Sequence, residues 1–347
     1  MVGFPIAPQR EISVPDVSVI IPTFRRPSLL HAAVESVLSQ RLLTATFEVV
    51  VVDNDPECSA EKVISGLALS APVVVRYVSE PRAGISHARN AGVRAAEGRY
   101  IAFLDDDETA GPEWLSKLIS TMRLYRADIV VGPTKPLFPR GVAIPKYAEK
   151  IYDADARVPT GEAVNWAGIG NALLVRDTCL AAAEPFDPRL GLSGGEDSVF
   201  LGLLREQGRR CVWCAEAAVT ETIQPEKLRP AYLLRRAFRG GQTTTYVPSA
   251  LTQPQWLLVL RWMTIGAAQV CLFGPLGITL GLAGREEWLS AMAKAASGLG
   301  KMFWHPAMHV RNYQINLNSK MASAGHVAKS RPAAAAGSQL DGPAPDR

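Results

Sequence analysis

The sequence predicts an α/β fold in which helices cover both faces of a doubly wound, mainly parallel sheet. Apolar, β-branched runs alternate with helix-like stretches from residue 17 onward. Each run is almost continuously apolar, which is typical of strands buried on both faces. Polar residues follow several of these runs, at the sheet edge where ligands bind in folds of this kind.

Four apolar runs are the expected strands of the first half of the chain. They lie at 17–21, 47–52, 73–78 and 100–104. Between the first two runs, apolar residues recur at helical spacing from Leu29 to Leu38, and Pro27 lies near the start of this stretch. Because proline is favoured in the first turn of a helix, a helix is expected here. Residues 85–96 and 112–126 are also helix-like, and the alternation implies right-handed crossovers.

The second half of the chain has a weaker pattern. Residues 127–160 are rich in proline and are expected to lie outside the sheet, whereas 171–175 and 210–213 are strand-like. Residues 318–347 consist largely of Ala, Ser, Pro and Gly with scattered charge. This composition predicts a disordered tail.

The composition narrows the class of protein. A chain of 347 residues with 48% hydrophobic residues can bury a sizeable core. A formal net charge of +4 is too small to indicate a general nucleic-acid-binding protein, so we expect no nucleic-acid partner. The five cysteines are sparse and odd in number, and residues 1–16 lack a basic segment followed by an apolar one. Both observations favour the cytoplasm.

Four consecutive carboxylates, from Asp105 to Glu108, directly follow the expected strand at 100–104. Like charges repel one another, so such a run is destabilising unless something neutralises it. A hard divalent cation that carries substrate phosphates is a suitable partner. The alternative is a solvated acidic turn that supplies negative charge to the helix at 112–126. The position at a strand's carboxyl end, matched by Asp53 on a second strand, favours the first interpretation.

A second candidate is the segment 194–200, in which two glycines precede Glu196 and Asp197. Flexible glycines beside paired carboxylates suit a loop that directs one acid into a cleft before a helix begins. The same two acids could equally complement the dipole at the start of that helix. Both interpretations remain open from the residues alone.

A third candidate is the basic stretch 225–241. It contains one acid, Glu226, and five cations: Lys227, Arg229, Arg235, Arg236 and Arg239. Its net charge therefore equals that of the whole chain. Arginine binds phosphate oxygens in a bidentate manner, so a diphosphate is one candidate ligand. Anionic lipid head groups are another, and a solvated helix face is the third alternative.

Taken together, these segments resemble the inverting family 2 glycosyltransferases, which adopt the GT-A fold. The resemblance covers about 17–240, with the motifs in the family's order. Those motifs are the segments 17–24, 48–53, 84–92, 98–107 and 195–197. The stretch from GGEDSVF through the arginine-rich segment looks most like bacterial exopolysaccharide enzymes of the succinoglycan-glucosyltransferase type.

The resemblance implies a nucleotide-sugar donor, a UDP-sugar by default, and a divalent cation, Mg²⁺ or Mn²⁺. Asp107 would hold the metal, and Asp197 would act as the general base on the acceptor hydroxyl. Glu196, Arg236 and Arg239 would lie near the diphosphate or the acceptor. The donor-binding residues would be Pro22, Thr23, Asp53, Arg89, Asp105 and Asp106.

The resemblance and the composition of the remaining segments together predict a domain organisation and a class of acceptor. The expected parts are an N-terminal arm (1–14), a GT-A domain (15–241), a C-terminal helical region (242–317) and the tail (318–347). The acceptor would be a glycan or a lipid-linked glycan in cell-surface polysaccharide or glycolipid assembly. Many relatives have a second Asp where this chain has Asn54, which leaves the nucleobase open. Two other classes are a non-catalytic sugar-nucleotide-binding or membrane-scaffold protein and a hydrolase that uses paired carboxylates.

Residues 262–284 carry no formal charge and are long enough to span a bilayer, although Gly274 and Pro275 interrupt them. A helix or hairpin in the membrane interface, anchored by Trp256 and Trp262, is a second interpretation. A buried helical pair packed on the catalytic domain is the third. We expect peripheral or monotopic contact at the cytoplasmic face of the inner membrane.

Overall fold

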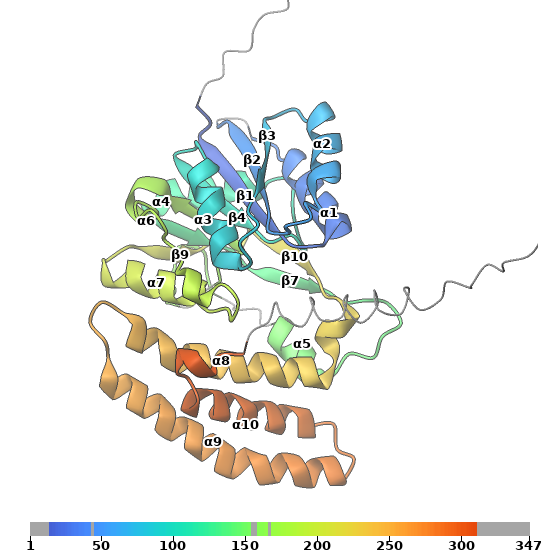
Figure 1. The fold of residues 1–347 in the computed structure, drawn as a ribbon, viewed down its shortest axis with the longest axis vertical. Helices are drawn as coiled ribbons and strands as arrows, with labels where there is room; N and C mark the ends of the chain where they lie inside the picture. The colour runs from blue at the N-terminus through green and yellow to red at the C-terminus, as the bar shows by residue number, and fades with distance from the viewer. Residues whose placement is uncertain (1–13, 43–44, 154–157, 166–167, 311–347) are drawn as a thin grey trace, which may run out of the picture. The chain divides into compact units, whose positions relative to one another are not determined.

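A seven-stranded sheet forms the core of the protein in a computed structural model that describes residues 14–42, 45–153, 158–165 and 168–310 (Figure 1). The strand order is β3-β2-β1-β4-β8-β6-β9. The strands are β1 (Val17–Thr23), β2 (Phe47–Asp53), β3 (Val75–Ser79), β4 (Tyr100–Leu104), β6 (Ile129–Val131), β8 (Asn171–Val175) and β9 (Cys211–Trp213). Only β8 runs antiparallel to its neighbours, which confirms the mainly parallel sheet. The expected tail, and the expected N-terminal arm up to residue 13, lie outside the described residues.

Helices cover both faces of this sheet, as expected for a doubly wound fold. They are α1 (Pro27–Leu38), α2 (Glu61–Ser70), α3 (Ile85–Ala95), α4 (Trp114–Tyr125), α6 (Arg176–Cys179) and α7 (Glu196–Glu206). Successive side chains of β1 alternate between the faces: Val19 and Ile21 pack with α1 and α4, and Ile20 packs on the side of α3 and α7. Both faces are apolar and buried, so the strand reads as a continuous apolar run.

The segment 127–160 is not wholly outside the sheet, contrary to the expectation from its prolines. β6 lies between β8 and β9 in the main sheet. A second sheet contains β5 (Glu108–Ala110), β10 (Val219–Thr222) and β7 (Thr134–Leu137), and a short helix, α5 (Lys146–Tyr152), follows. These strands have three or four residues each, too few for a periodic pattern, and Pro136 is tolerated because β7 is an edge strand.

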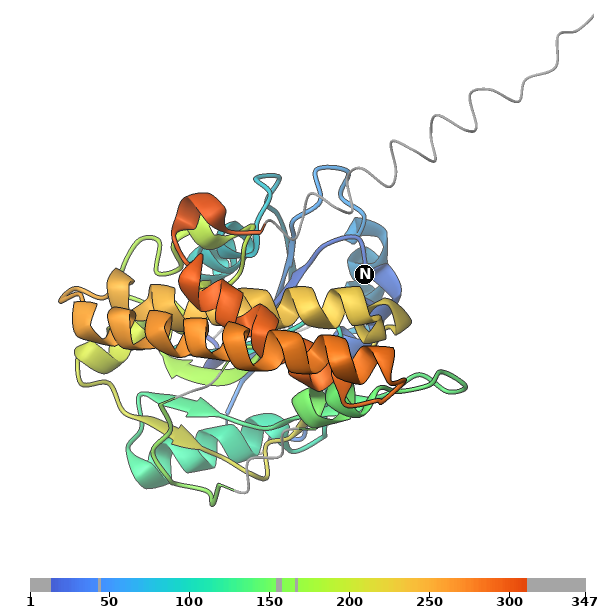
Figure 2. The same cartoon turned by 90° about the horizontal axis from the view of Figure 1, so that it is seen from below.

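Three long helices follow the sheets: α8 (Pro230–Ala250), α9 (Trp256–Leu282) and α10 (Trp288–Met302). The two views show them side by side, with α9 farthest from the sheet (Figures 1 and 2). Glycines allow close contact between them: a Cβ on Gly266 would lie 2.6 Å from the Gly298 carbonyl oxygen, and one on Gly300 would lie within 2 Å of that of Phe238. The expected boundary after residue 241 falls inside α8, and α9 continues through Pro275.

Candidate active site

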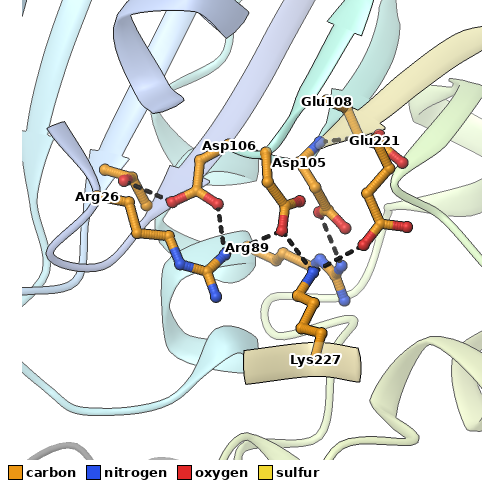
Figure 3. Close-up of polar contacts among 9 residues, drawn as sticks. Arg26, Arg89, Asp105, Asp106, Glu108, Glu221 and Lys227 are labelled. Carbon is orange, nitrogen blue, oxygen red and sulfur yellow. Dashed lines mark hydrogen bonds and ion pairs between the residues drawn. The ribbon is translucent and has the colours of Figure 1, made fainter. Parts of the chain in front are cut away.

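The acidic run after β4 lies at the carboxyl edge of the sheet, beside the end of β1 (Figure 3). The Thr23 hydroxyl donates a hydrogen bond to Asp106 Oδ2 at 2.8 Å. Arg26, in the turn before α1, donates from Nη1 to Asp106 Oδ1 at 3.0 Å and to Asp107 Oδ2 at 3.2 Å. Two side chains from the β1–α1 turn therefore hold two neighbouring carboxylates in place.

Lys227 joins the acidic run to the second sheet. It lies on a short 3-10 helix, η2 (Pro225–Leu228), and its Nζ donates to Asp107 Oδ2 at 2.8 Å and to Glu221 Oε1 at 2.7 Å. Burial by itself lowers the pKa of this ammonium, but the Glu221 and Asp107 carboxylates outweigh it and raise the pKa. Lys227 is therefore charged in the folded protein.

A second group of charges surrounds the start of α7. Arg89 on α3 donates from Nη1 to Glu196 Oε1, and its Nη2 lies 3.5 Å from Asp105 Oδ1. Glu196 Oε2 is buried and has no hydrogen-bond partner among the described residues. Burial raises the pKa of Glu196 to about 7, against the effect of Arg89 and with a further increase from Asp197. Gly195, with a φ of 91°, provides the left-handed turn that begins the helix.

The site carries more acids than bases. Burial raises the pKa of Asp106 to about 6, and partial removal from water raises the pKa of Asp105; like-charged neighbours add to both shifts. The pKa of Glu108 is raised well above its usual value, by burial first and then by Asp105 and Glu221. Each shift means that ionising these acids together is unfavourable, so an added cation would stabilise the site.

A cavity of about 380 Å³ opens beside these acids. The residues from the predicted site that line it are Arg89, Asp105, Asp197 and Arg236. Asp197 Oδ1 accepts hydrogen bonds from the backbone N–H of Ser198 at 2.7 Å and from its hydroxyl at 3.2 Å. The structure therefore places Asp197 of α7 and Asp105, the first acid after β4, in the wall of the same cavity. Gly170 makes room for Asp105, because a Cβ there would lie 2.7 Å from Asp105 Oδ2.

The two remaining arginines of the predicted site lie on α8. The Arg236 guanidinium stacks over the Tyr152 ring, 4.5 Å from its centroid, and faces the cavity. Arg239 lies one turn further along, where burial lowers its pKa. Its Nε atom has no hydrogen-bond partner in the described part of the chain, and Arg239 does not line the cavity.

Asp53 and Asn54 organise the loop after β2. Asp53 Oδ1 accepts from the Asp55 N–H, and Oδ2 accepts from the Ala60 N–H and the Tyr77 hydroxyl. The Asn54 amide donates to two backbone carbonyls, those of Glu80 and Arg82, and its oxygen accepts from the Gly84 N–H. An Asp at position 54 could not donate those two hydrogen bonds.

Pro22 is a buried residue of β1, beside Thr23. Both carboxylate oxygens of Asp53 accept hydrogen bonds from the loop after β2. A role in donor binding stays a prediction for Asp53 and for Pro22.

Three charged residues of this site were not predicted individually: Arg26, Glu221 and Lys227. Lys227 is one cation of the basic stretch, and Arg26 lies in the polar segment after the first strand, so each had a weak signal. Glu221 had none, because it lies on a four-residue strand. Its position opposite Glu108 in the β5–β10 pair exists only in the folded chain.

Comparison with known proteins connects this geometry to a family. Residues 18–160 match the family model described as glycosyl transferase family 2. The succinoglycan biosynthesis protein ExoM of Rhizobium meliloti is 34% identical over 224 residues, which is 64% of this chain and 71% of ExoM. The chain belongs to glycosyltransferase family 2. The glycosyltransferase AglE of Haloferax volcanii is 26% identical over 186 residues, or 53% of this chain and 60% of AglE.

Solved structures place this family 2 glycosyltransferase in the GT-A fold. The mannosyltransferase PcManGT of Pyrobaculum calidifontis, in complex with GDP-Man and Mn²⁺, has a TM-score of 0.59 at 18% identity, covering 84% of this chain and 88% of its own. TarS of S. aureus, residues 1–349 in complex with UDP, has a TM-score of 0.50 at 16% identity, covering 82% and 89%. At this identity the likeness confirms the fold alone.

Proposed function

We propose that this glycosyltransferase moves a sugar from a nucleoside-diphosphate donor to an acceptor hydroxyl, with inversion at the anomeric carbon. The observation that carries the proposal is the shared cavity, which Asp197 and Asp105 both line. Asp197 takes the proton of the acceptor hydroxyl as its oxygen attacks the anomeric carbon. The bond from that carbon to the diphosphate oxygen breaks, and the nucleoside diphosphate leaves with the electron pair. One displacement with one base inverts the configuration.

The carboxylates suit a divalent cation, Mg²⁺ or Mn²⁺, that binds together with the donor. Among the described residues no three His, Cys, Asp or Glu side chains form a ready-made metal cage. Mg²⁺ needs only one or two protein carboxylates when phosphate oxygens complete its shell. The buried acids Asp106, Asp107 and Glu108 fit that requirement, with Asp107 as the proposed ligand. Asp105, two residues before it, lines the cavity. When bound, the cation would neutralise charge on the departing diphosphate.

Donor contacts would come from both sides of the acidic run. Thr23 and Arg26 hold Asp106, and Arg89 holds Asp105 near Glu196. PcManGT binds GDP-Man and TarS binds UDP, which supports a nucleotide-sugar donor here. UDP-sugars and GDP-sugars are thus the first donors to test.

We further propose that α9 lies flat on the cytoplasmic face of the inner membrane. It is long and apolar enough to cross a membrane, and the window of highest hydropathy is only 11% buried. Its exposed apolar side chains include Trp256, Leu257, Leu260, Leu272, Ile278 and Leu282. A buried helical pair therefore does not account for its composition.

The packing of α10 favours a flat position over a span. α10 is joined to α9 where Gly266 meets Gly298, and Lys301 of α10 donates to Gln269 of α9 at 3.1 Å. A spanning α9 would carry α10 and its lysines, Lys294 among them, into hydrocarbon, where charges are costly. With α9 in the interface, α10 and α8 stay on the aqueous side.

A second cavity supports a lipid-linked acceptor. It has a volume of about 440 Å³ and lies between α7, α8 and the start of α9. Its lining includes Ser198, the residue after Asp197, and Trp262 of α9. Apolar side chains line it, among them Leu201, Val247, Leu251 and Leu258. An acceptor with its hydroxyl at Asp197 could lead its lipid portion through this cavity toward the membrane.

The test of the proposed reaction is a panel of UDP- and GDP-sugars assayed with Mg²⁺ or Mn²⁺ and membrane extract as the acceptor source. We expect transfer from one donor, with the opposite anomeric configuration in the product by NMR. Retention of configuration would contradict the single displacement. Release of free sugar at the same rate with no acceptor would indicate a hydrolase instead.

A further inference from the structure

We infer that Lys227 is a positioning residue with two alternate partners: Asp107 in the unloaded enzyme and the donor diphosphate in the loaded one. The inference rests on the proposed function for its second partner. Its first partner follows from the hydrogen bonds of the Lys227 ammonium, which donates to Asp107 Oδ2 at 2.8 Å and to Glu221 Oε1 at 2.7 Å. Figure 3 shows Lys227 beside Glu221. The side chain is only 14% exposed, so it fills the space between the two acids.

Asp107 is shared by two cations in this arrangement. Its Oδ2 atom accepts hydrogen bonds from both Lys227 Nζ and Arg26 Nη1. A divalent cation that uses Asp107 as a ligand needs a lone pair on this carboxylate, and it would meet the ammonium within a few ångströms. Two positive charges this close repel one another strongly in a partly buried site. Lys227 must therefore release Asp107 before the carboxylate can serve a metal.

The surroundings of Lys227 allow its ammonium to move while its backbone stays in place. Leu228, the next residue, is buried in a cluster with Tyr152, Ile223 and Leu233, which anchors η2. The lysine side chain itself is a flexible four-carbon stem. Glu221 can hold the ammonium during this movement, because the hydrogen bond between Lys227 and Glu221 does not depend on Asp107. The ammonium can turn away from Asp107 and keep one carboxylate partner.

The cavity gives the released ammonium a second partner. Glu221 lines the cavity together with Asp105 and Arg236. A diphosphate held at this edge would present its oxygens there, and lysine binds phosphate as a compact point charge. In the loaded enzyme, Lys227 would stabilise the negative charge of the departing diphosphate. In the unloaded enzyme, it reduces the repulsion among the carboxylates of the acidic run.

Two binding measurements with opposite expected signs test this inference. Mn²⁺ alone is titrated into the wild type, Lys227→Gln and Lys227→Arg, with manganese EPR as the readout. UDP and GDP are then titrated by calorimetry at saturating Mn²⁺. For Lys227→Gln we expect Mn²⁺ to bind at least tenfold more tightly and the nucleotide at least tenfold more weakly. Lys227→Arg keeps the charge, so Mn²⁺ should bind it no more tightly than the wild type.

Lys135→Gln is the matched control. Lys135 lines the same cavity on β7 and is exposed, so its loss removes one positive charge without touching Asp107. Mn²⁺ affinity should change by less than twofold in this variant. An equal gain in both Gln variants would mean a general electrostatic effect and would overturn the inference, as would unchanged or weaker Mn²⁺ binding in folded Lys227→Gln.

Failure of the proposed function has a different signature. A wild type that binds neither UDP nor GDP contradicts the donor assignment, yet the Mn²⁺ titration needs no donor and still decides whether Lys227 competes for Asp107. If Lys227→Gln does not fold, the comparison of Lys227→Arg with the wild type is used instead. Mn²⁺ that binds Lys227→Arg more tightly than the wild type would contradict competition by charge. Absence of Mn²⁺ binding in every variant, both alone and with UDP or GDP present, would overturn the inference outright.

Discussion

Arg89 and Glu196 form a buried ion pair between two helices, although they lie 107 positions apart in the chain. Their side chains are 6% and 5% exposed. The pair joins α3, which follows the first half of the sheet, to the first turn of α7. The pair therefore anchors the turn of α7 that carries the proposed base, Asp197.

Removal of one partner from this pair should destabilise the fold. Arg89→Met leaves Glu196 buried without its hydrogen-bond donor, and we expect the free energy of unfolding to fall by about 1–3 kcal/mol, because the acid can take up a proton instead of staying charged. Urea denaturation at pH 7 measures this. The matched control is Arg94→Met on the same helix, whose side chain is 46% exposed and whose loss should change stability by less than about 1 kcal/mol. Equal losses in both variants would contradict a buried pair.

The raised pKa of Glu196 predicts a pH-dependent stability. The folded protein holds this proton up to about pH 7, whereas the unfolded chain releases it near pH 4.5. The folded state thus binds more protons within this window, so its stability falls as the pH rises through it. Relative to Glu196→Gln, the wild type should lose up to about 3 kcal/mol between pH 4.5 and pH 7. A stability difference that does not change with pH would contradict the raised pKa.

The glycine pair before α7 offers a matched comparison of backbone strain and crowding. Gly194 and Gly195 have φ angles of 83° and 91°. Gly194→Ala meets no atom within 4 Å and should lower stability by about 1–2 kcal/mol through strain alone. Gly195→Ala also brings a Cβ within 2.9 Å of Thr243 Oγ1 on α8. It should lower stability and transfer further than Gly194→Ala, measured by thermal unfolding and initial rates; equal effects would show that this contact is unimportant.

The membrane proposal predicts a charge-sensitive face on α9. Leu257 and Leu272 are 86% and 67% exposed. Leu257→Glu with Leu272→Glu should weaken binding to anionic phospholipid vesicles at least tenfold in a sedimentation assay, because glutamate opposes insertion into the interface. Leu69→Glu, on α2 and 91% exposed, is the control and should bind as the wild type does. Unchanged binding by the α9 variant would remove α9 from the membrane contact.

The long strands could be predicted because each is apolar on both faces over five or more residues. The fold could therefore be predicted from β1, β2 and β4, and most of the site from the acids that follow β4. The second sheet could not be predicted, because β5 and β7 have three and four residues and depend on tertiary pairing. Lys227 was one cation among five in its stretch, and only its approach to Asp107 sets it apart.

Asp53 marks a different limit of prediction. Its position at the end of β2 was recognised from the sequence, but its partners were not. Three hydrogen bonds from Asp55, Ala60 and Tyr77 occupy both of its oxygens. The sequence pattern predicted where Asp53 lies, but the conformation of the loop that hydrogen-bonds to it depends on packing in the folded chain.

The most direct test of the account is transfer by Asp197→Asn beside Ser198→Ala, with donor binding measured on the same preparations. Asparagine keeps the size of the side chain but cannot take a proton, so transfer should fall about 100- to 10,000-fold while donor affinity stays within about twofold. Ser198→Ala keeps the carboxylate and its backbone hydrogen bond and should stay within a few-fold of the wild type. Undiminished transfer by Asp197→Asn would contradict Asp197 as the general base.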